Sequence, residues 1–391
     1  MLNTSFSPWP SYTQEEANAV ARVLLSNRVN YWTGQEGREF EREFAAFAGT
    51  GYCVAVANGT VALDLALKGL GIGNGDEVIV TSRTFLASVT CIVNAGARPV
   101  FADVDADSQG ITAETVAPLI TENTRAIVAV HLAGWPCDMD GLNELASRYD
   151  LSVIEDCAQA HGATYKGNPV GSLGHVAAWS FCQDKIMTTG GEGGMVSTND
   201  RKLWSRMWSY KDHGKSWEAV YEREHPPGFR WLHESFGTNW RMTEMQAAIG
   251  RIQLQRMPGW TDRRRANCET IWQTARKCKA LRVPDVPEYI GHGGYKCYVF
   301  VEPAALKAGW DRDRVQAEIV NAGVPCFSGS CSEVYFEKAI QDAGMAPVER
   351  LPVARDLGET SLMFLVHPTL TSDEIKLTCE VIARVAEEAS A

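Results

Sequence analysis

The chain has 391 residues, of which 45% are hydrophobic and 22% charged, and its formal net charge is −11. That length predicts two domains, and the composition is typical of a globular enzyme. The acidic balance argues against a nucleic-acid-binding protein and against a basic membrane-surface protein. Because we find neither an apolar stretch of about 18 residues nor a basic leader before an apolar run, we expect no membrane span and no signal peptide.

The N-terminal half predicts an arm, two helices and then a regular alternation of strands and helices. Pro8 and Pro10 flank Trp9 in the arm, Thr13 with the acids after it marks a helix start, and residues 36–48 have helical periodicity. Apolar runs then lie at 53–57, 77–82, 99–104, 126–132, 151–157, 175–181 and 193–198, with helical segments at 60–70, 85–94, 113–120 and 140–148. Strands that are apolar on both faces and alternate with amphipathic helices predict an α/β fold, with a mostly parallel central sheet covered by helices on both faces.

The C-terminal part has a different character. A helix is expected over 242–257, and beyond Pro258 we expect a charged helix over 261–279, a strand over 298–302 and further helices, the last one after Thr371. We place the domain boundary near residue 255. The large domain at 1–255 then carries the N-terminal arm, and a smaller C-terminal α+β domain covers 256–391.

The eleven cysteines follow neither a metal-binding nor a disulfide pattern. None stands in a CxxC pair or in a cysteine–histidine cluster with zinc spacing, and apolar neighbours surround several of them, Cys157 for example. We therefore expect reduced thiols in the core, no metal site and a cytoplasmic protein.

Lys185 is the first candidate for chemistry. It stands just past the apolar run 175–181, and glycines crowd the positions after it at 190, 191, 193 and 194. Glycines let the backbone approach a ligand closely, and a lysine amine near a carbonyl cofactor can form an imine. On spacing alone, a solvated surface lysine is the more common interpretation.

Three further segments follow strands and could meet the same ligand. Asp156 lies at the C-terminal end of the run 151–157, where parallel sheets bind ligands, and could either cap a helix or hold a pyridine nitrogen protonated. Gln159 and His161 follow shortly after it. The turn at 58–60 could bind an anion, with Ser180 adding a hydroxyl. Phe85 could belong to the core or stack on a flat ring.

In this order along the chain, several segments resemble the DegT/DnrJ/EryC1/StrS family of pyridoxal-phosphate-dependent sugar aminotransferases. The resemblance covers nearly the whole chain. The segments that carry it are YWTGQEGREFEREFAAFAG (31–49), NGTVALDLAL (58–67), GDEVIVTSRTFLAS (75–88), ARPVFADVD (97–105), VIEDCAQAHGATYKG (153–167), SFCQDKIMTTGGEGGMVSTND (180–200), FGTNWRMTEMQAAIGRIQL (236–254) and LVHPTLTSDEI (365–375).

The resemblance implies an aspartate aminotransferase-like fold (fold type I), pyridoxal phosphate as cofactor, and a homodimer with shared active sites. Lys185 matches the lysine that carries the cofactor as a Schiff base, Asp156 the acid paired with the pyridinium nitrogen, and Gln159 the residue against the ring. Phe85 matches a stacking aromatic. The positions that match phosphate contacts are Gly59, Thr60, Ser180 and, reaching over from the partner subunit, Asn239.

Two positions depart from the pattern common in the family. Gly190 and Gly191 stand where many members have one glycine, and Cys182 stands where many have histidine or an aromatic residue. Both affect only the loop that lines the site. Related sugar dehydratases carry histidine in place of the lysine, so Lys185 favours transamination.

The resemblance also suggests a substrate. Residues 7–13, 131–140 and 209–242 look like the bacillosamine-pathway subgroup, which implies transfer of the amino group of L-glutamate to C4 of a UDP-linked 4-keto-6-deoxy-N-acetyl-hexosamine for bacterial glycan synthesis. A GDP-4-keto-6-deoxy-mannose aminotransferase (perosamine synthase) is the alternative within this chemistry. The candidate substrate contacts are Tyr31, His161, Lys211, His213 and Arg230, although most of the basic residues in this region could equally lie on a solvated loop.

Two other classes of protein stay open. One is a pyridoxal-phosphate-binding regulator without turnover, against which the intact set of Lys185, Asp156 and Gln159 argues. The other is a simple binding module for nucleotide sugars, which would lack the visible absorbance of a bound cofactor.

Overall fold

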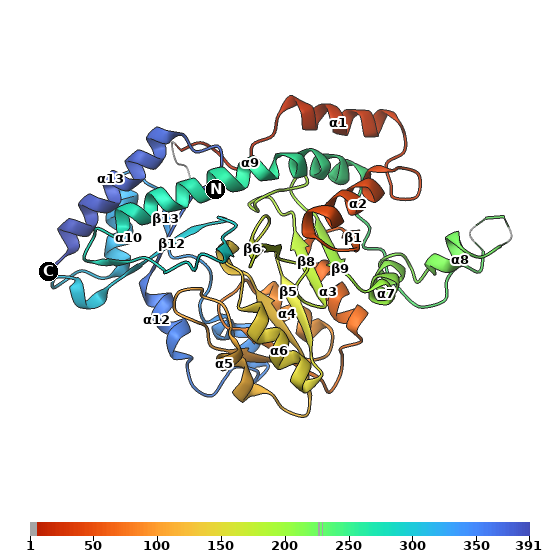
Figure 1. Cartoon of the computed structure of the whole chain (residues 1–391), viewed down its shortest axis with the longest axis horizontal. Coiled ribbons are helices and arrows are strands. Elements are labelled where there is room, and N and C mark those ends of the chain that lie inside the picture. Colours follow the sequence, from red (N-terminus) through yellow and green to blue (C-terminus); the bar gives the residue numbers. More distant parts are fainter. Residues whose placement is uncertain (1–5, 226, 229) are drawn as a thin grey trace.

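A seven-stranded sheet forms the centre of the protein, and Figure 1 shows its twist. The structure is a computed structural model that describes residues 6–225, 227–228 and 230–391. The strand order is β1-β9-β8-β5-β4-β2-β3. Neighbours from β8 to β3 run parallel, whereas β9 is antiparallel to both β8 and β1. The strands are β1 Tyr52–Val56, β2 Glu77–Thr81, β3 Arg98–Ala102, β4 Thr124–Val130, β5 Ser152–Asp156, β8 Val176–Ser180 and β9 Gly194–Thr198. The prediction of a mostly parallel sheet is confirmed.

Helices cover both faces of this sheet because its strands are apolar on both sides. Successive side chains of a strand point to opposite faces, so Val78 and Val80 pack against one layer of helices and Ile79 against the other. The first layer consists of α3 Gly59–Leu70, α4 Ala87–Asn94 and α7 Arg201–Lys211; the second consists of α2 Glu36–Ala48, α5 Ala113–Val116, α6 Met139–Tyr149 and α9 Glu244–Ala275. Separate apolar clusters therefore cover the two faces of the sheet.

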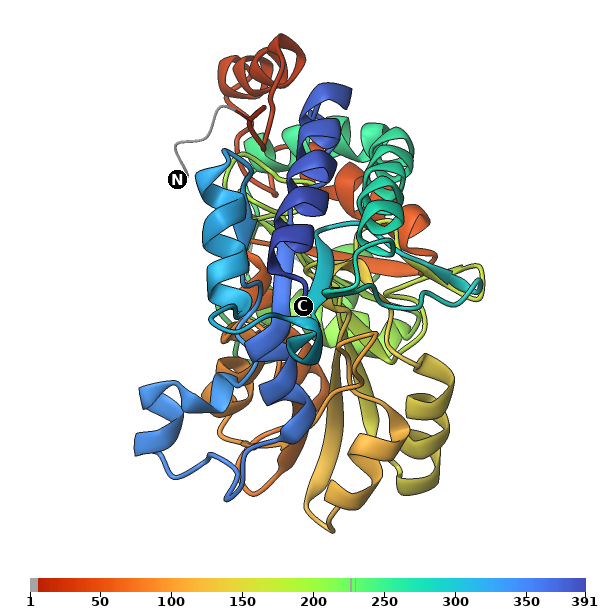
Figure 2. The same ribbon diagram turned by 90° about the vertical axis from the view of Figure 1, so that its left-hand side faces the viewer.

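A smaller antiparallel sheet lies beside the first, in the order β10-β12-β14-β13. Its strands are β10 Leu281–Arg282, β12 Cys297–Val301, β13 Cys326–Phe327 and β14 Ser361–Phe364, and α10 Arg312–Asn321 and α13 Ser372–Ala389 pack on it with the end of α9. Figure 2 shows α10 and α13 side by side on this part. A third, short sheet has the order β11-β6-β7, with β6 Thr164–Tyr165, β7 Asn168–Pro169 and β11 Ile290–Gly291. The remaining elements are α8 Trp217–Tyr221, α11 Lys338–Asp342, α12 Pro352–Thr360, and the 3-10 helices η1 Ala117–Leu119, η2 Leu132–Gly134, η3 Pro303–Ala305 and η4 Val334–Phe336.

Helix α9 runs through the region where the sequence predicted two helices. The interpretation of separate helices on either side of Pro258 is wrong, because one helix of 32 residues contains that proline. A proline inside a helix costs about 3 kcal/mol. Leu254 and Met257 pack on the large core and Ile271 and Trp272 on the small one, and their burial offsets this cost. The boundary near residue 255 lies inside α9 and stays a prediction.

The N-terminal arm crosses from one part of the molecule to the other. Helix α1 Gln14–Leu25 begins as predicted, with Thr13 and Glu16 forming a capping box. Ahead of it, Ser7 donates hydrogen bonds from its backbone nitrogen and hydroxyl to Glu374, at 2.5 and 3.0 Å. Trp9 stacks on His367 with 5.9 Å between ring centroids. The arm is thus held against α13 and the residues that follow β14 in the smaller part of the molecule. Among the described residues, no helix combines the length and apolar character needed to cross a membrane.

Two adjacent carboxylates on β5 point to opposite faces of the sheet. Glu155 is buried and accepts backbone hydrogen bonds from Gly171, Leu173 and Gly174 at 2.7, 2.8 and 2.6 Å, while His131 Nε2 lies 3.0 Å away. It therefore joins β5 to the segment that precedes β8. The next residue, Asp156, faces the layer that contains α3 and α4.

We expect Glu155→Ala to lower the free energy of unfolding by about 3–5 kcal/mol, because three N–H groups and a histidine lose their buried acceptor. Chemical denaturation monitored by circular dichroism measures this loss. Glu144→Ala is the matched control, since it removes a carboxylate from an exposed pair with Arg148 and should cost less than about 1 kcal/mol. Equal losses for the two variants would contradict the role of Glu155.

Candidate active site

A cavity of about 620 Å³ lies where the carboxyl ends of β5 and β8 meet the N-termini of α3 and α4. This is the edge of a parallel sheet at which α/β proteins bind ligands. The sequence-predicted residues that line it are Gly59, Thr60, Phe85, Asp156, Gln159, Ser180 and Lys185. Residues that are up to about 130 positions apart in the chain therefore face one space.

Asp156 forms the floor of this cavity. Its side chain is at the end of β5, and the residue is 4% exposed. Ser88 Oγ donates a hydrogen bond to its Oδ2 at 2.7 Å, the backbone N–H of Ala158 donates to its Oδ1 at 3.1 Å, and the Thr84 hydroxyl lies 2.9 Å from that of Ser88. A buried carboxylate held in this way is suited to a cationic N–H group. Ser88 was missed by the sequence analysis, because only the fold brings it to Asp156 across 68 residues.

The first turn of α3 forms a cradle for an anion. Asn58 caps the helix by accepting a hydrogen bond from the backbone of Val61 at 3.0 Å, and α3 begins at Gly59. The first N–H groups of a helix lack intrahelical acceptors and carry the positive end of its dipole. A Cβ at Gly59 would lie 2.5 Å from Ser180 Cβ and 2.9 Å from its Oγ. Glycine at this position therefore lets the helix start and the Ser180 hydroxyl lie close enough together to contact a single anion.

Lys185 is half-buried on the cavity wall, and several segments hold it there. Its backbone carbonyl accepts a hydrogen bond from Trp9 Nε1 at 2.8 Å, and its Nζ lies 5.3 Å from the centroid of the Tyr295 ring. In the loop that follows, Gly190 and Gly191 have φ angles of 88° and 122°, which favour glycine. The prediction that glycines shape this loop is confirmed. Trp9 and Tyr295 were not recognised as neighbours of Lys185 in the sequence.

Phe85 and Gln159 supply two further walls. Phe85 is 70% exposed although it is a large apolar side chain, so it is available to stack on a ligand and is not part of the core. Gln159 Oε1 accepts a hydrogen bond from the backbone of Ala133 at 2.9 Å, which fixes the plane of its amide. Both positions are compatible with a flat ring above Asp156.

His161 does not line the cavity, and we correct its assignment as a substrate contact. It is 0% exposed and packs on Trp179 and Phe181, with ring centroids 5.2 and 5.6 Å away. Burial, followed by the positive charges of Lys185 and Arg264, lowers the pKa of His161 to about 3. A neutral histidine enclosed by aromatic rings is part of the core.

Tyr31 and Lys211 are also buried away from the cavity, which corrects their assignment as substrate contacts. Lys211 Nζ lies 3.7 Å from the centroid of the Tyr31 ring and 3.5 Å from Glu41 Oε1, and the Tyr31 hydroxyl donates to Glu41 at 2.9 Å. Burial lowers the pKa of Lys211, although Glu41 opposes this effect. Glu41 and the Tyr31 ring compensate the buried ammonium, so these three residues form a structural cluster.

His213, Arg230 and Asn239 lie outside this cavity on exposed positions. The segment that contains α8 extends away from the body of the molecule on the right of Figure 1. The backbone of Asn239 forms an antiparallel bridge with Asp212, which fixes the start of this excursion. The three residues are not brought to the site of their own chain, and their roles stay predictions.

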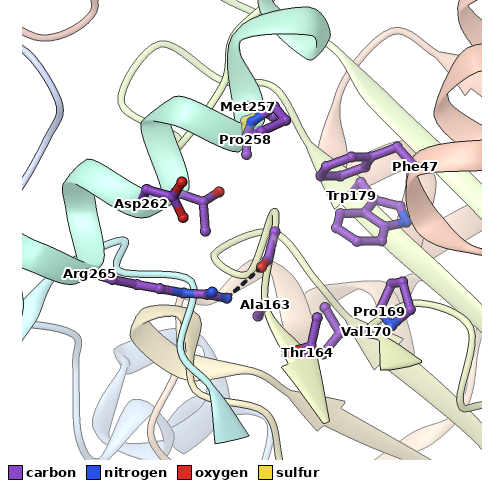
Figure 3. Close-up of a pocket in the computed structure, with 12 residues that line it drawn as sticks. Phe47, Ala163, Thr164, Pro169, Val170, Trp179, Met257, Pro258, Asp262 and Arg265 are labelled. Atoms are coloured by element: carbon purple, nitrogen blue, oxygen red, sulfur yellow. Dashed lines mark hydrogen bonds between the residues drawn. The ribbon is translucent and has the colours of Figure 1, made fainter. Parts of the chain in front are cut away.

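A separate hollow of about 290 Å³ lies between α9 and residues 162–170 (Figure 3). Arg265 Nη2 reaches across it and donates to the carbonyl oxygen of Gly162 at 3.0 Å. None of the sequence-predicted site residues lines this hollow. The chemistry-bearing residues therefore gather at the sheet edge and not here.

Comparison with known proteins agrees with the family resemblance of the sequence. A sequence model described as the DegT/DnrJ/EryC1/StrS aminotransferase family matches residues 10–383. The chain is 34% identical to GDP-perosamine synthase of Escherichia coli O157:H7 over 376 residues, covering 95% of this chain and 96% of that enzyme. It is 35% identical to UDP-N-acetyl-3-dehydro-α-D-glucosamine 3-aminotransferase of Acidithiobacillus ferrooxidans, with 98% and 96% covered. The X-ray structure of an aminotransferase from Psychrobacter cryohalolentis matches with a TM-score of 0.97 at 63% identity and covers 98% and 99% of the two chains. The expected fold type I architecture is confirmed.

We expect Gly59→Ala to weaken pyridoxal phosphate binding by about tenfold or more, because the added methyl group would press on Ser180 inside the anion cradle. Titration of the apoprotein with the cofactor, followed by visible absorbance, measures the affinity. Gly259→Ala is the control, since no atom lies within 4 Å of a Cβ at that position. Unchanged affinity in Gly59→Ala would contradict a phosphate site at this turn.

Proposed function

The chain belongs to the DegT/DnrJ/EryC1/StrS aminotransferase family, and from this premise we propose that it transfers the amino group of L-glutamate to C4 of a UDP-linked 4-keto-6-deoxy-N-acetyl-hexosamine. Sugar aminotransferase activity and the pyridoxal phosphate cofactor are properties of this family. The observation that carries the proposal is one cavity that joins Lys185, Asp156 and the anion cradle of Gly59, Thr60 and Ser180. The product would be a UDP-4-amino-4,6-dideoxy sugar for bacterial glycan synthesis.

The residues of the cavity fit this cofactor. Gly59 leaves room for a phosphate group beside Ser180, and the buried Asp156 would hold the protonated ring nitrogen. Phe85 and Gln159 would bound the two ring faces. When bound, pyridoxal phosphate supplies an aldehyde that takes up the amino group and a ring that acts as an electron sink.

Lys185 would act twice. Its amine would hold the cofactor covalently before the donor binds. Once the donor amine displaces it, the Lys185 amine would be free and neutral. It would then move a proton from the donor Cα to the cofactor carbon to which Lys185 had been bonded, and the reverse transfer would aminate the sugar. The hydrogen bond from Trp9 to the Lys185 carbonyl would keep the backbone in place during this exchange.

The names of two relatives support two different nucleotide sugars as the substrate. The A. ferrooxidans enzyme, whose name specifies a UDP-linked N-acetyl sugar, supports the UDP proposal. The E. coli enzyme, named for GDP-perosamine, supports GDP-4-keto-6-deoxy-mannose as the second candidate. The segments 7–13, 131–140 and 209–242 favour the first. A non-catalytic regulator would have no need for the complete set of Lys185, Asp156 and Gln159 in one cavity.

We further infer a cytoplasmic homodimer. All eleven cysteines are free, as suits a reducing compartment. His213, Arg230 and Asn239 are exposed beyond the cavity of their own chain, so a partner subunit could present them to the neighbouring site. Asn239 would then contact the cofactor phosphate, and the two basic residues the substrate diphosphate.

We expect the purified protein with pyridoxal phosphate and L-glutamate to convert UDP-4-keto-6-deoxy-N-acetyl-glucosamine to its 4-amino product, and Lys185→Ala to lose this activity because no amine remains to move the proton. Mass spectrometry and NMR identify the product. Lys279→Ala, which removes an exposed lysine, should remain active. Conversion of only the GDP-linked 4-keto sugar would contradict the UDP assignment, and an unchanged visible spectrum on adding glutamate would contradict transamination.

We also expect mixtures of Lys185→Ala and Asn239→Ala subunits to regain activity. A hybrid dimer would contain one site with both an intact Lys185 and the partner's intact Asn239, so random mixing should restore about a quarter of wild-type activity. Activity is measured after subunit exchange and compared with each variant alone. No gain over the separate variants would show that Asn239 serves its own chain.

A further inference from the structure

A second cavity, of about 400 Å³, adjoins the cofactor cavity between the N-terminal arm and the smaller sheet. Asp184, beside Lys185, lines both cavities. Trp9 of the arm, Arg264 of α9 and Lys296 just before β12 line the second one. The cavity therefore meets the reactive lysine from the side of the arm.

Arg264 is a buried cation for which the described residues supply no carboxylate partner. It is 1% exposed, and within the part of the chain that the structure describes its Nε and Nη2 have no hydrogen-bond partner. Its Nη1 donates to the carbonyl oxygen of Gly294 at 3.3 Å, and its Cζ lies 4.8 Å from the centroid of the Trp9 ring. Burial lowers the pKa of Arg264 to about 9. Burying a guanidinium without a carboxylate is costly, so the arrangement suits an anion that is supplied by a ligand.

Lys296 adds a second positive charge to the same cavity. Its Nζ lies 4.9 Å from the centroid of the Tyr295 ring. Burial lowers the pKa of Lys296 to about 8, with Asp184 acting against that and Arg264 and Lys185 adding to it. Asp184 is already engaged by the Tyr295 hydroxyl, which donates to it at 2.5 Å. Two cations thus face the cavity against one occupied carboxylate.

Comparison with Lys211 shows that a buried cation in this protein does not in general lack a carboxylate partner. Lys211 is as fully buried as Arg264, and both lie over an aromatic ring, but only Lys211 has a carboxylate beside it, with Glu41 Oε1 3.5 Å from its Nζ. Among the described residues, neither Arg264 nor Lys296 forms an ion pair within 4.0 Å. A ligand anion would supply for them what Glu41 supplies for Lys211.

We propose that Arg264 and Lys296 bind a carboxylate of the amino donor and so orient a five-carbon dicarboxylate toward Lys185; this rests on the proposed transaminase function. The amines of Lys185 and Lys296 lie 5.3 and 4.9 Å from the centroid of the same Tyr295 ring, so they are at most about 10 Å apart. A five-carbon dicarboxylate about 6 Å long, with a hydrogen bond of about 3 Å at one end, spans that separation.

The rest of the lining favours a small carboxylate over a nucleotide diphosphate. Phe6, Phe327, Leu365 and Val366 surround the two cations with apolar surface. Such surface suits the methylene groups of a short aliphatic acid. The cavity is also smaller than the one that would hold the cofactor.

Calorimetric titration of the cofactor-loaded enzyme with glutarate tests the proposal. Glutarate has five carbons and two carboxylates but neither an amine nor a ketone, so its binding is read without any turnover. We expect Arg264→Met and Lys296→Met to weaken it by about tenfold or more, which corresponds to the loss of one charge-assisted contact. Lys277→Met, which removes an exposed lysine, is the matched control and should bind like wild type. Replacement of an unpaired buried charge by an apolar side chain of similar length favours retention of the fold, and thermal unfolding checks this.

The outcomes separate this inference from the function on which it rests. If the wild type aminates the sugar but both methionine variants keep the wild-type affinity for glutarate and the wild-type KM for glutamate, the donor site is wrong and the function stands. If glutarate binds and the variants lose it while no sugar is aminated, the carboxylate site stands and the function is wrong. If the variants lose affinity for UDP and not for glutarate, the cavity serves a diphosphate and the proposal is overturned.

Discussion

The close approach of three backbone segments at the edge of the large sheet determines the geometry of the whole site. A Cβ on Gly59 would lie 2.5 Å from Ser180 Cβ, and one on Gly194 would lie 2.3 Å from the carbonyl oxygen of Asn58. The start of α3, the end of β8 and the start of β9 can meet only because Gly59 and Gly194 carry no side chain. Their meeting brings the helix terminus, the Ser180 hydroxyl and the loop of Lys185 to one cavity.

In strand β5, the alternation of side chains places two adjacent carboxylates in different environments. Its alternation sends Glu155 into the core, where backbone N–H groups satisfy it, and sends Asp156 to the cavity, where Ser88 and Ala158 hold it. Glu155 fixes the end of the strand to the core. Asp156, the next residue, is thereby held in place by the packing around it. A carboxylate buried in the core and a carboxylate that lines the cavity thus stand side by side.

The two parts of the molecule are joined at the site as well as through α9. The arm is anchored to α13 of the smaller part by the hydrogen bonds from Ser7 to Glu374, yet Trp9 donates to the carbonyl of Lys185 in the larger part. Tyr295, which precedes β12, covers the Lys185 amine. A displacement of the smaller part would therefore move both the groups that contact Lys185 and the cavity that Arg264 and Lys296 line.

Local patterns predict the strand–helix alternation, the capped start of α1, and the positions of Asp156 at the end of a strand and of Lys185 after one. They do so because hydrophobic period and cap chemistry report burial within a few residues. Only the tertiary structure decided that Pro258 lies inside one helix and that His161, Tyr31 and Lys211 are buried. It also decided that Ser88 contacts Asp156 and that Tyr295 contacts Lys185. The physical reason is that the environment of a polar side chain is set by partners far along the chain. Lys211 is compensated by Glu41, 170 residues away, and Arg264 has no such carboxylate among the described residues. Local sequence around either cation contains no sign of that difference.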